Sequence, residues 1–335
     1  MRALLLLALC AGCDDPATGG AADLAAATAT GDASAGSDGP LASGDGAVVS
    51  GRGFPASAPW VSFYGTAQQM GDLTKVASTF RVINLDADPA GGSPNFTPEQ
   101  ISTLQDGGHN RVISYLNLGS CEMFRTYWSS APVGLLSCSA NTKAQLGPYD
   151  GYPDEVWMNL GDADYQALML DVADRLAATG VDGFFLDNFE LVEHGTNTTN
   201  GPCDAACAQG GLDFIERLRA RFPDRLIVMQ NATSDVTRLG VTSANTKFPS
   251  LLDGISHEEV YAPADVGAQQ ELAAWKTLGL QPGGRPFFIA TEDYVTSCTN
   301  TTAAMTVYSQ SRAAGFSPYA TDASGGQMVV CYWPF

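Results

Sequence analysis

Basic residues and histidines are scarce in this sequence of 335 residues. Lysine and arginine together number 17 against 36 aspartates and glutamates, there are 3 histidines, and the formal net charge is -19. Nucleic-acid binding needs a basic face for the phosphates, so we expect no nucleic-acid partner. An acidic surface suits a cationic ligand, although such a surface more often serves solubility alone. The shortage of histidine also argues against a His-rich metallohydrolase.

Motifs of several common enzyme classes are also missing. The chain has no G-x-S-x-G nucleophile motif, no phosphate-loop motif and no G-x-G-x-x-G. Residues 257–261 read H-E-E-V-Y, which is a near miss to the zinc motif H-E-x-x-H. The second histidine is absent, and the segment follows a strand pattern instead of lying in a helix. We therefore reject a zinc site and expect no cofactor.

The apolar run near the amino terminus is too short for a permanent membrane helix. Arg2, a leucine-rich run and small residues before Cys13 are typical of an export signal over residues 1–13. Ala11-Gly12-Cys13 resembles a bacterial lipobox, which would make Cys13 a lipidated first residue. The alternative is ordinary cleavage nearby and a soluble secreted product. Membrane contact is thus expected only through a lipid anchor, at the bacterial outer membrane or cell surface, and the protein is expected to be a monomer.

Residues 14–52 are rich in Ala, Gly, Ser, Thr and Asp and hold almost no large apolar residues. Such a composition cannot form a core, so this segment is expected to be a flexible linker. The folded domain is then expected over residues 53–335.

Six cysteines follow the predicted signal, and an even number in an exported protein suggests disulfides. Six cysteines allow 15 pairings. Sequence proximity favours Cys121–Cys138, Cys203–Cys207 and Cys298–Cys331. The Cys203–Cys207 pair could instead be half of a metal site, but no second cysteine pair or nearby histidine completes it.

Strand-like and helix-like runs alternate from Trp60 onward. The expected strands cover 60–64, 80–85, 111–118, 181–186, 225–229, 252–256, 286–290 and 316–320, and the helices 67–78, 97–106, 162–179, 212–222, 269–278 and 302–314. Residues 119–160 are expected to be a long loop. Eight such units predict an α/β fold, a single-domain (β/α)8 TIM barrel, over an open doubly wound sheet. The short tail after residue 320 leaves no room for a full eighth helix.

Polar residues follow nearly every predicted strand. They are Tyr64, Asp86, Asp88, Tyr115, Asn117, Glu122, Asp187, Asn188, Glu190, Gln230, Asn231, His257, Glu258, Glu259, Tyr261, Glu292, Asp293, Tyr294, Tyr319 and Asp322. Any one of them, Asp187 included, could merely cap a helix or a turn. Their repetition at the carboxyl ends of parallel strands favours a polar pocket. Carboxylates with amides and tyrosines suit glycoside cleavage, which needs two carboxyl groups.

Four segments in order carry a more specific signal: Y-L-N-L-G-S-C-E at 115–122, G-V-D-G-F-F-L-D-N at 180–188, Q-N at 230–231 and D-G-I-S-H-E-E-V-Y at 253–261. This pattern resembles glycoside hydrolase family 114, which contains endo-α-1,4-polygalactosaminidases on a (β/α)8 barrel. The resemblance implies a polysaccharide substrate, a cationic amino-sugar polymer cleaved at internal linkages. The chain differs where the family often reads S-x-G-E-x-E, since Asn117 and Ser120-Cys121 stand there. One acidic contact is therefore expected to be missing from that loop.

The resemblance makes Asp187 the nucleophile and Glu258 the general acid and base. Glu259 is the alternative to Glu258 for this role. Adjacent strand residues point to opposite faces, so only one of the two can enter the pocket. A retaining mechanism would require carboxyl groups about 5–5.5 Å apart. The resemblance also implies substrate-binding roles for Tyr64, Asp86, Asp88, Tyr115, Glu122, Asn188, Gln230, Asn231, Glu259, Tyr261, Asp293, Tyr294 and Tyr319. For the tyrosines, and for Trp128 and Trp157, packing is an equally good interpretation.

Two alternatives to this function stay open. The chain could bind carbohydrate on a degenerate barrel without turnover, or it could hydrolyse a different glycan with the same two carboxylates. Only the enzyme hypotheses predict release of new reducing ends.

Overall fold

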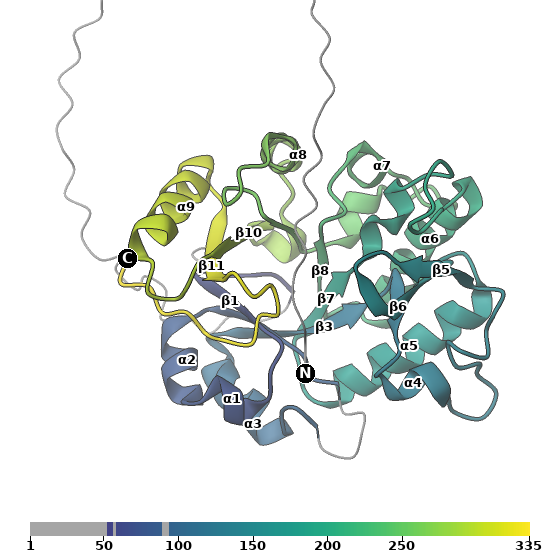
Figure 1. The fold of residues 1–335 in the computed structure, drawn as a ribbon, viewed down its shortest axis with the longest axis horizontal. Helices are drawn as coiled ribbons and strands as arrows, with labels where there is room; N and C mark the ends of the chain where they lie inside the picture. Colours follow the sequence, from purple (N-terminus) through teal and green to yellow (C-terminus); the bar gives the residue numbers. More distant parts are fainter. Residues whose placement is uncertain (1–51, 56–57, 89–93) are drawn as a thin grey trace, which may run out of the picture. The chain divides into compact units, whose positions relative to one another are not determined.

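The computed structural model describes residues 52–55, 58–88 and 94–335, which form a barrel of parallel strands (Figure 1). Each strand pairs in parallel with the next in the order β1 (Trp60–Phe63), β2 (Val82–Leu85), β3 (Arg111–Asn117), β7 (Gly183–Asp187), β8 (Leu226–Gln230), β9 (Gly254–Glu258), β10 (Phe288–Val295) and β11 (Ser317–Asp322). The expected (β/α)8 fold is therefore confirmed. Strand β10 runs further than expected, and it carries Glu292 to Tyr294 within its pleat.

Helices lie around the outside of the strands (Figure 1). They are α1 (Ala67–Met70), α2 (Leu73–Thr79), α3 (Pro98–Gln105), α5 (Ala163–Ala178), α6 (Ala205–Arg221), α7 (Asp235–Arg238), α8 (Val266–Lys276) and α9 (Thr301–Ala314), with 3-10 helices at Asp106–Gly108, Phe189–Glu193, Phe248–Leu251 and Pro282–Gly284. The single helix expected over 67–78 is two helices. Gly71 has a φ of 85°, and the side chain of Asp72 caps α2 by accepting from Thr74 and Lys75 backbone N–H groups.

The inward-facing positions change character along the strands. Trp60, Phe185 and Phe288 pack their rings together, with centroids 6.2 and 6.1 Å from Trp60 to the two phenylalanines. Two residues further along β1 and β7, the inward positions are Ser62 and Asp187, and on β10 Glu292 follows Phe288 by four residues. Aromatic rings thus fill the amino-terminal part of the barrel, and polar groups gather toward the carboxyl ends, where TIM barrels carry their chemistry.

The stretch 119–160 is not the long loop that the sequence predicts. It forms an antiparallel sheet of β4 (Ser120–Glu122), β6 (Tyr152–Met158) and β5 (Gln145–Tyr149), with α4 (Thr126–Ser129) after β4. A tight turn at Asp150-Gly151 joins β5 to β6, and Gly151 has a φ of 87°. Asp-Gly between strands is a strong hairpin signal, because both turn positions tolerate positive φ, and the loop prediction overlooked it.

Both chain ends of the described part contact the barrel. Strands β1 and β11 lie together, and the Trp60 indole donates to the Ser317 carbonyl oxygen at 2.9 Å. Residues 323–335, all of them described, contain no helix, as expected for a shortened eighth unit. Phe54 stacks on Phe288 at 4.6 Å, at the amino-terminal end of the barrel. The predicted signal over 1–13, with Cys13, and the predicted linker up to residue 51 lie outside the described residues, whereas Arg52 already pairs with buried Asp253.

Three disulfides tie down loops in the pairing that sequence proximity favours. Cys121 pairs with Cys138, Cys203 with Cys207 and Cys298 with Cys331. The last of these joins the loop after β10 to the carboxyl-terminal tail. In the part of the chain that the structure describes, no helix has the length and apolar character needed to cross a bilayer.

Candidate active site

Asp187 and Glu258 are the last residues of β7 and β9, with only β8 between these strands. All three strands are parallel, so the two carboxyl groups lie at the same rim of the barrel. Burial raises the pKa of Asp187 to about 7, and the neighbouring Glu258 carboxylate adds to the shift. Hydrogen bonds from the Tyr115 hydroxyl and the Asn188 backbone N–H oppose it. The Glu258 carboxylate is therefore close enough to Asp187 to act on it electrostatically.

Glu258 is held by three side chains from three different parts of the chain. Its Oε1 accepts from the Tyr294 hydroxyl at 2.7 Å and from Gln327 Nε2 at 3.1 Å. Its Oε2 accepts from Asn231 Nδ2 at 3.4 Å, and Asn231 Oδ1 accepts from the Glu258 backbone N–H at 3.0 Å. Asn231 has a φ of 61°, which turns its side chain back toward β9.

Glu259, the rival acid, is placed differently. It has a φ of 57°, its side chain is exposed, and its backbone N–H donates to the Glu292 carbonyl oxygen at 2.7 Å. The strand thus ends at Glu258, and the chain turns at the next residue. Glu258 makes the contacts with Asn231 and Tyr294 at the rim, and Glu259 makes none of them.

Two tyrosines and the loop that follows β3 lie against Asp187. Tyr64 and Tyr115 pack with ring centroids 4.8 Å apart, and the Tyr64 hydroxyl accepts from Asn84 at 3.1 Å. Leu118 and Gly119 both donate backbone hydrogen bonds to the Asp187 carbonyl oxygen. A Cβ atom at Gly119 would lie 1.7 Å from the Asn188 carbonyl oxygen, so the approach of these loops requires glycine.

Glu155 of β6 supplies a carboxylate beside Asp187. Its Oε2 accepts from Ser120 Oγ at 2.6 Å, from Asn188 Nδ2 at 3.3 Å and from Asn117 Nδ2 at 3.4 Å. Its Oε1 has no hydrogen-bond partner and is not among the enclosed polar atoms of the described residues, so it is open to solvent. Burial raises the pKa of Glu155, and these donors oppose the shift. A carboxylate thus lies beside Asn117 and Ser120, and it comes from a strand that the sequence did not predict.

Two further carboxyl groups are buried around the pair. Glu292 faces inward on β10, is fully buried, and has no hydrogen-bond partner for either oxygen among the described residues. Burial raises the pKa of Glu292 well above its ordinary value, and Glu258, Asp293 and Asp187 add to the shift. Burial and Asp187 likewise raise the pKa of Glu190. Burial therefore favours the protonated form of both Glu292 and Glu190.

Three carboxylates that the sequence assigned to substrate converge instead on Arg125. The guanidinium lies 2.9 Å from Asp86, 3.2 Å from Asp88 and 2.6 Å from Glu122, and all four side chains are about nine-tenths buried. Burial raises the pKa of Glu122 to about 7 against the opposing charge of Arg125. Arg125 also lies 5.5 Å from the ring of Tyr115, so this cluster packs behind a residue that contacts Asp187.

Other predicted binding residues are spread over different environments. The carboxylate of Asp293 is directed away from Glu292 and accepts from the Tyr261 and Ala262 backbone N–H groups at 2.6 and 2.8 Å. Gln230 is buried, and its side-chain carbonyl oxygen has no partner among the described residues. Tyr319 is fully buried beneath the tail, where its hydroxyl accepts from the Cys331 N–H at 3.0 Å. A ring with no exposed surface cannot stack on a sugar, so Tyr319 belongs to the core.

Aromatic residues of the β5–β6 hairpin lie near this rim. Tyr149 stacks on Trp157 at 4.0 Å and contacts Tyr152 at 4.7 Å. Trp157 is buried and donates to Asn200 at 2.6 Å, so it packs in the loop, and Trp128 is a partly buried neighbour of the core. Tyr152 is 56% exposed, and burial together with the charges of Glu258, Glu155 and Asp187 raises its pKa. Tyr152 is therefore an exposed aromatic residue of this hairpin that lies near both Asp187 and Glu258.

Several residues of the site could not be found by sequence reasoning about strand ends. Gln327, Glu155, Tyr152 and Arg125 lie in loops or in the unpredicted antiparallel sheet. Glu292 stood among the strand-end residues, but nothing in the sequence marked it as an inward, buried position. Among residues 52–55, 58–88 and 94–335, no group of His, Cys, Asp and Glu side chains is arranged to hold a metal ion.

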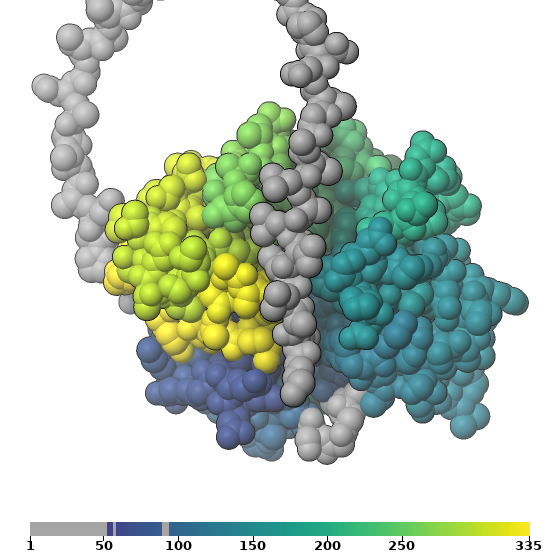
Figure 2. Space-filling model, in the orientation of Figure 1, coloured from purple at the N-terminus to yellow at the C-terminus, as the bar shows by residue number. Residues whose placement is uncertain are grey.

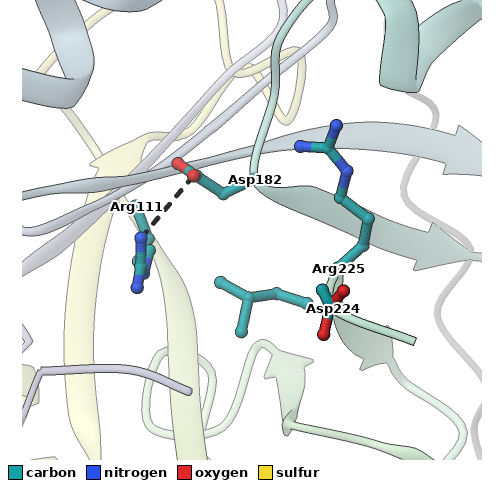
Figure 3. Close-up of a pocket in the computed structure, with 5 residues that line it drawn as sticks. Arg111, Asp182, Asp224 and Arg225 are labelled. Atoms are coloured by element: carbon teal, nitrogen blue, oxygen red, sulfur yellow. Dashed lines mark ion pairs between the residues drawn. The ribbon is translucent and has the colours of Figure 1, made fainter. Parts of the chain in front are cut away.

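A separate cavity of about 260 Å³ lies at the opposite rim, lined by Arg111, Asp182, Asp224, Arg225 and Leu226 (Figure 3). Arg111 and Asp182 point toward each other across it, with nitrogen and oxygen 3.6 Å apart. Asp182 also accepts from the Val112 N–H at 2.8 Å, which ties the start of β3 to the residues before β7. Residues at this end of a TIM barrel serve stability, so we assign the cavity no part in catalysis.

Comparison with known proteins agrees with this geometry. The model of glycoside-hydrolase family GH114 matches residues 54–244, which is more than half of the chain. A Deinococcus radiodurans protein described as uncharacterized is 26% identical over 247 residues, covering 70% of this chain and 71% of that protein. The range matched by the family model contains Asp187 and ends before Glu258.

Two solved structures show the same fold. The glycoside hydrolase domain of PelA from Pseudomonas aeruginosa gives a TM-score of 0.60 at 16% identity, over 83% of this chain and 98% of that chain. Ega3 from Aspergillus fumigatus, in complex with galactosamine, gives a TM-score of 0.57 at 16% identity, over 86% of this chain and 98% of that chain. With the family match, the barrel and its rim of carboxylates, the chain belongs to glycoside-hydrolase family GH114.

Proposed function

We propose that this protein hydrolyses internal α-1,4 linkages of a galactosamine-containing polysaccharide. The observation that carries the proposal is the position of Asp187 and Glu258, which end β7 and β9 at one rim with only β8 between them, close enough for Glu258 to raise the pKa of Asp187. Two interacting carboxyl groups at this rim are what glycoside cleavage needs. Membership of GH114 supports the reaction type, and the galactosamine bound to Ega3 supports the sugar.

In the proposed reaction Asp187 is the nucleophile and Glu258 the acid and base. The Asp187 carboxylate bonds to the anomeric carbon while the glycosidic C–O bond breaks, and Glu258 gives its proton to the leaving oxygen. Glu258 then takes a proton from water, whose oxygen displaces Asp187 from the sugar. The net configuration at the anomeric carbon is retained. This cycle starts with one proton on the pair, and mutual repulsion of two nearby carboxylates favours that state.

The proposed substrate is cationic, and the charge of the rim supports this choice. The Glu155 oxygen that is open to solvent lies near Asp187, and exposed Glu259 lies beside Glu258. An ammonium group bound near Glu155 would also lower the pKa of Asp187, because a nearby positive charge favours its ionised form. We propose that Tyr152 stacks on a sugar ring, since its aromatic face is exposed at the same place.

The remaining predicted binding residues divide into two groups. We propose that direct contacts to the sugar chain come from Tyr64, Tyr115, Asn188, Gln230, Asn231, Glu259, Tyr261 and Tyr294. Asp86, Asp88 and Glu122 act through Arg125, which supports Tyr115 from behind. Asp293 positions the turn at Tyr261, and Tyr319 is left out because it is buried.

The three disulfides are consistent with export to an oxidising compartment. We propose in addition that Cys13 carries a lipid that anchors the chain. Growth of producing bacteria with labelled palmitate tests this, since a Cys13→Ala variant should lose the label while the protein is still exported.

The test of the function is release of reducing ends from a panel of α- and β-linked polysaccharides, with acetylated and deacetylated polygalactosamine among them. The wild-type protein should act on deacetylated polygalactosamine. Asp187→Asn and Glu258→Gln should abolish release while the circular dichroism spectrum stays unchanged. Glu259→Gln is the matched control, one residue from Glu258, and it should keep kcat, with its effect confined to KM because Glu259 is proposed to bind the substrate only. Binding without release by the wild-type protein would refute the proposal, as would release from another glycan only.

A further inference from the structure

The carboxyl-terminal tail of the chain reaches the proposed active site at Gln327. Figure 2 shows the last residues of the chain, in yellow, between the purple segments of the amino-terminal strands and helices and the green segments further along the chain. Gln327 is only 2% exposed and has a φ of 49°. A buried polar side chain on an otherwise irregular tail calls for a partner, because an unpartnered amide would cost free energy.

The amide of Gln327 is fully engaged, and the partners fix which way it points. Ser62 Oγ accepts from Asn84 Nδ2 at 2.9 Å, so the Ser62 hydroxyl proton is available to donate to Gln327 Oε1. The Gln327 amide nitrogen must then face the other way. There it donates to Glu258 Oε1 at 3.1 Å and lies 3.3 Å from the Tyr294 hydroxyl.

The backbone around Gln327 is fastened as well. Its carbonyl oxygen accepts from the Tyr64 N–H at 2.8 Å, which attaches the tail to the end of β1. Further along, Cys331 is bonded to Cys298 and donates its N–H to the Tyr319 hydroxyl, and the Trp333 indole donates to the Ala320 carbonyl oxygen at 2.9 Å. The backbone of Gln327 and the tail that follows it are therefore held in place, which keeps its side chain within reach of Glu258.

The two oxygens of Glu258 are consequently unequal. Oε1 receives donors from both Tyr294 and Gln327, whereas Oε2 has one longer contact with Asn231. An oxygen that accepts two hydrogen bonds is a poor place for a proton, because the donors already occupy its lone pairs. The acidic proton is thus directed to Oε2.

We propose that Gln327 is a positioning residue for Glu258, which orients the carboxyl group so that Oε2 carries the proton transferred to the leaving oxygen. The inference rests on the proposed function and adds to it a contribution from the carboxyl-terminal tail. Residues Ser62 and Asn84 complete the chain of hydrogen bonds that keeps the Gln327 amide in this orientation.

The test uses Gln327→Met, which keeps the length of the side chain and removes the donor. We expect kcat on deacetylated polygalactosamine to fall about 10- to 100-fold with KM changed less than about threefold, as for loss of one hydrogen bond to a charged group. The basic limb of the pH profile of kcat/KM should move to higher pH, since a carboxylate with fewer donors holds its proton more tightly. Val329→Ala, at a neighbouring tail residue that is 37% exposed, is the control and should behave as the wild type.

A merely structural role would give a different result. If Gln327 only held the tail, Gln327→Met would lower the melting temperature and leave the position of the basic limb unchanged. Replacement of Cys298 and Cys331 by serine separates the two effects, since it loosens the tail and keeps the donor. An unmoved basic limb in Gln327→Met, or wild-type kcat, would overturn the inference.

A second readout does not depend on activity. In a nitrogen-15 spectrum the side-chain amide signals of Gln327, assigned by their loss in Gln327→Met, should shift with pH in the wild type and lose that dependence in Glu258→Gln. If the wild-type enzyme cleaves no galactosamine polymer but these signals behave as described, the proposed function fails and the contact stands. Signals that ignore Glu258→Gln would contradict the contact itself.

Discussion

Removal of the positive charge of Arg125 is the perturbation that we expect to destabilise this domain most clearly. Arg125 is the shared partner of Asp86, Asp88 and Glu122, with separations of 2.6 to 3.2 Å and side chains only 8% to 11% exposed. Arg125→Met would keep most of the apolar stem and leave three buried carboxylates facing one another. Loss of one partner of a buried ion pair costs about 3–5 kcal/mol, so we expect a loss of that order at pH 7.

The loss of unfolding free energy in Arg125→Met should depend on pH, and the raised pKa of Glu122 sets the direction of this dependence. Burial already raises the pKa of Glu122 to about 7 against the opposing charge of Arg125, so loss of that charge should make Glu122 bind its proton more tightly. The folded variant would then hold more protons than its unfolded chain from about pH 4 to pH 7. Its stability must therefore fall as the pH rises through this range, more steeply than that of the wild type.

Urea unfolding at pH 5 and pH 7 measures both effects. Arg238→Met is the matched control, because Arg238 makes a 2.6 Å ion pair with Asp235, whose side chain is 73% exposed. Such surface pairs contribute about 0–1 kcal/mol, so this variant should be close to the wild type at both pH values. A cost below about 1 kcal/mol for Arg125→Met at pH 7, or equal costs at pH 5 and pH 7, would refute the reasoning.

Three further predictions concern the rim. Glu292→Gln should keep the fold and flatten the decline of unfolding free energy between pH 5 and pH 7, by up to about 1.4 kcal/mol per pH unit, because burial raises the pKa of Glu292 in the folded protein and unfolding removes that shift. An unchanged slope in urea titrations would contradict this. Glu155→Gln should raise KM about 3- to 10-fold for deacetylated polymer and leave KM for N-acetylated polymer unchanged, because only the deacetylated polymer carries an ammonium group. Equal effects on both polymers would exclude a contact with the ammonium group. Gly119→Ala should lower kcat at least about tenfold with little loss of secondary structure, since its Cβ would clash with the Asn188 carbonyl oxygen next to Asp187. Full activity would show that the loop can move to accommodate the Cβ.

The barrel, and the place of Asp187 and Glu258 at the ends of its strands, could be predicted from the sequence because both depend on local patterns. The run that ends at Asp187 is an apolar strand after an amphipathic helix, and the chemistry of parallel sheets places the polar residue that follows at the active rim. Strand alternation also implied that only one of Glu258 and Glu259 can face the pocket. The structure separates them through a feature that alternation does not contain, the positive φ at Glu259 that ends the strand.

The residues that surround Asp187 and Glu258 could not be identified from local sequence patterns, because their contacts join distant parts of the chain. Gln327 meets Glu258 across 69 residues, and no local pattern marks a glutamine in an irregular tail as buried. Glu155 required the antiparallel sheet, whose one local signal was the turn at Asp150-Gly151. Asp86, Asp88 and Glu122 looked like ligands for a cationic sugar because the sequence does not show that Arg125 reaches all three.

Asp187 is the proposed nucleophile, and trapping of the glycosyl-enzyme tests this role most directly. A 5-fluoro-α-galactosaminyl fluoride should react with the wild-type protein and slow the release of the bound sugar. Mass spectrometry of the digested protein should then find one added sugar, on the peptide that contains Asp187, and none in Asp187→Asn. A label on Glu258, or turnover of polymer without any trapped sugar, would contradict the account.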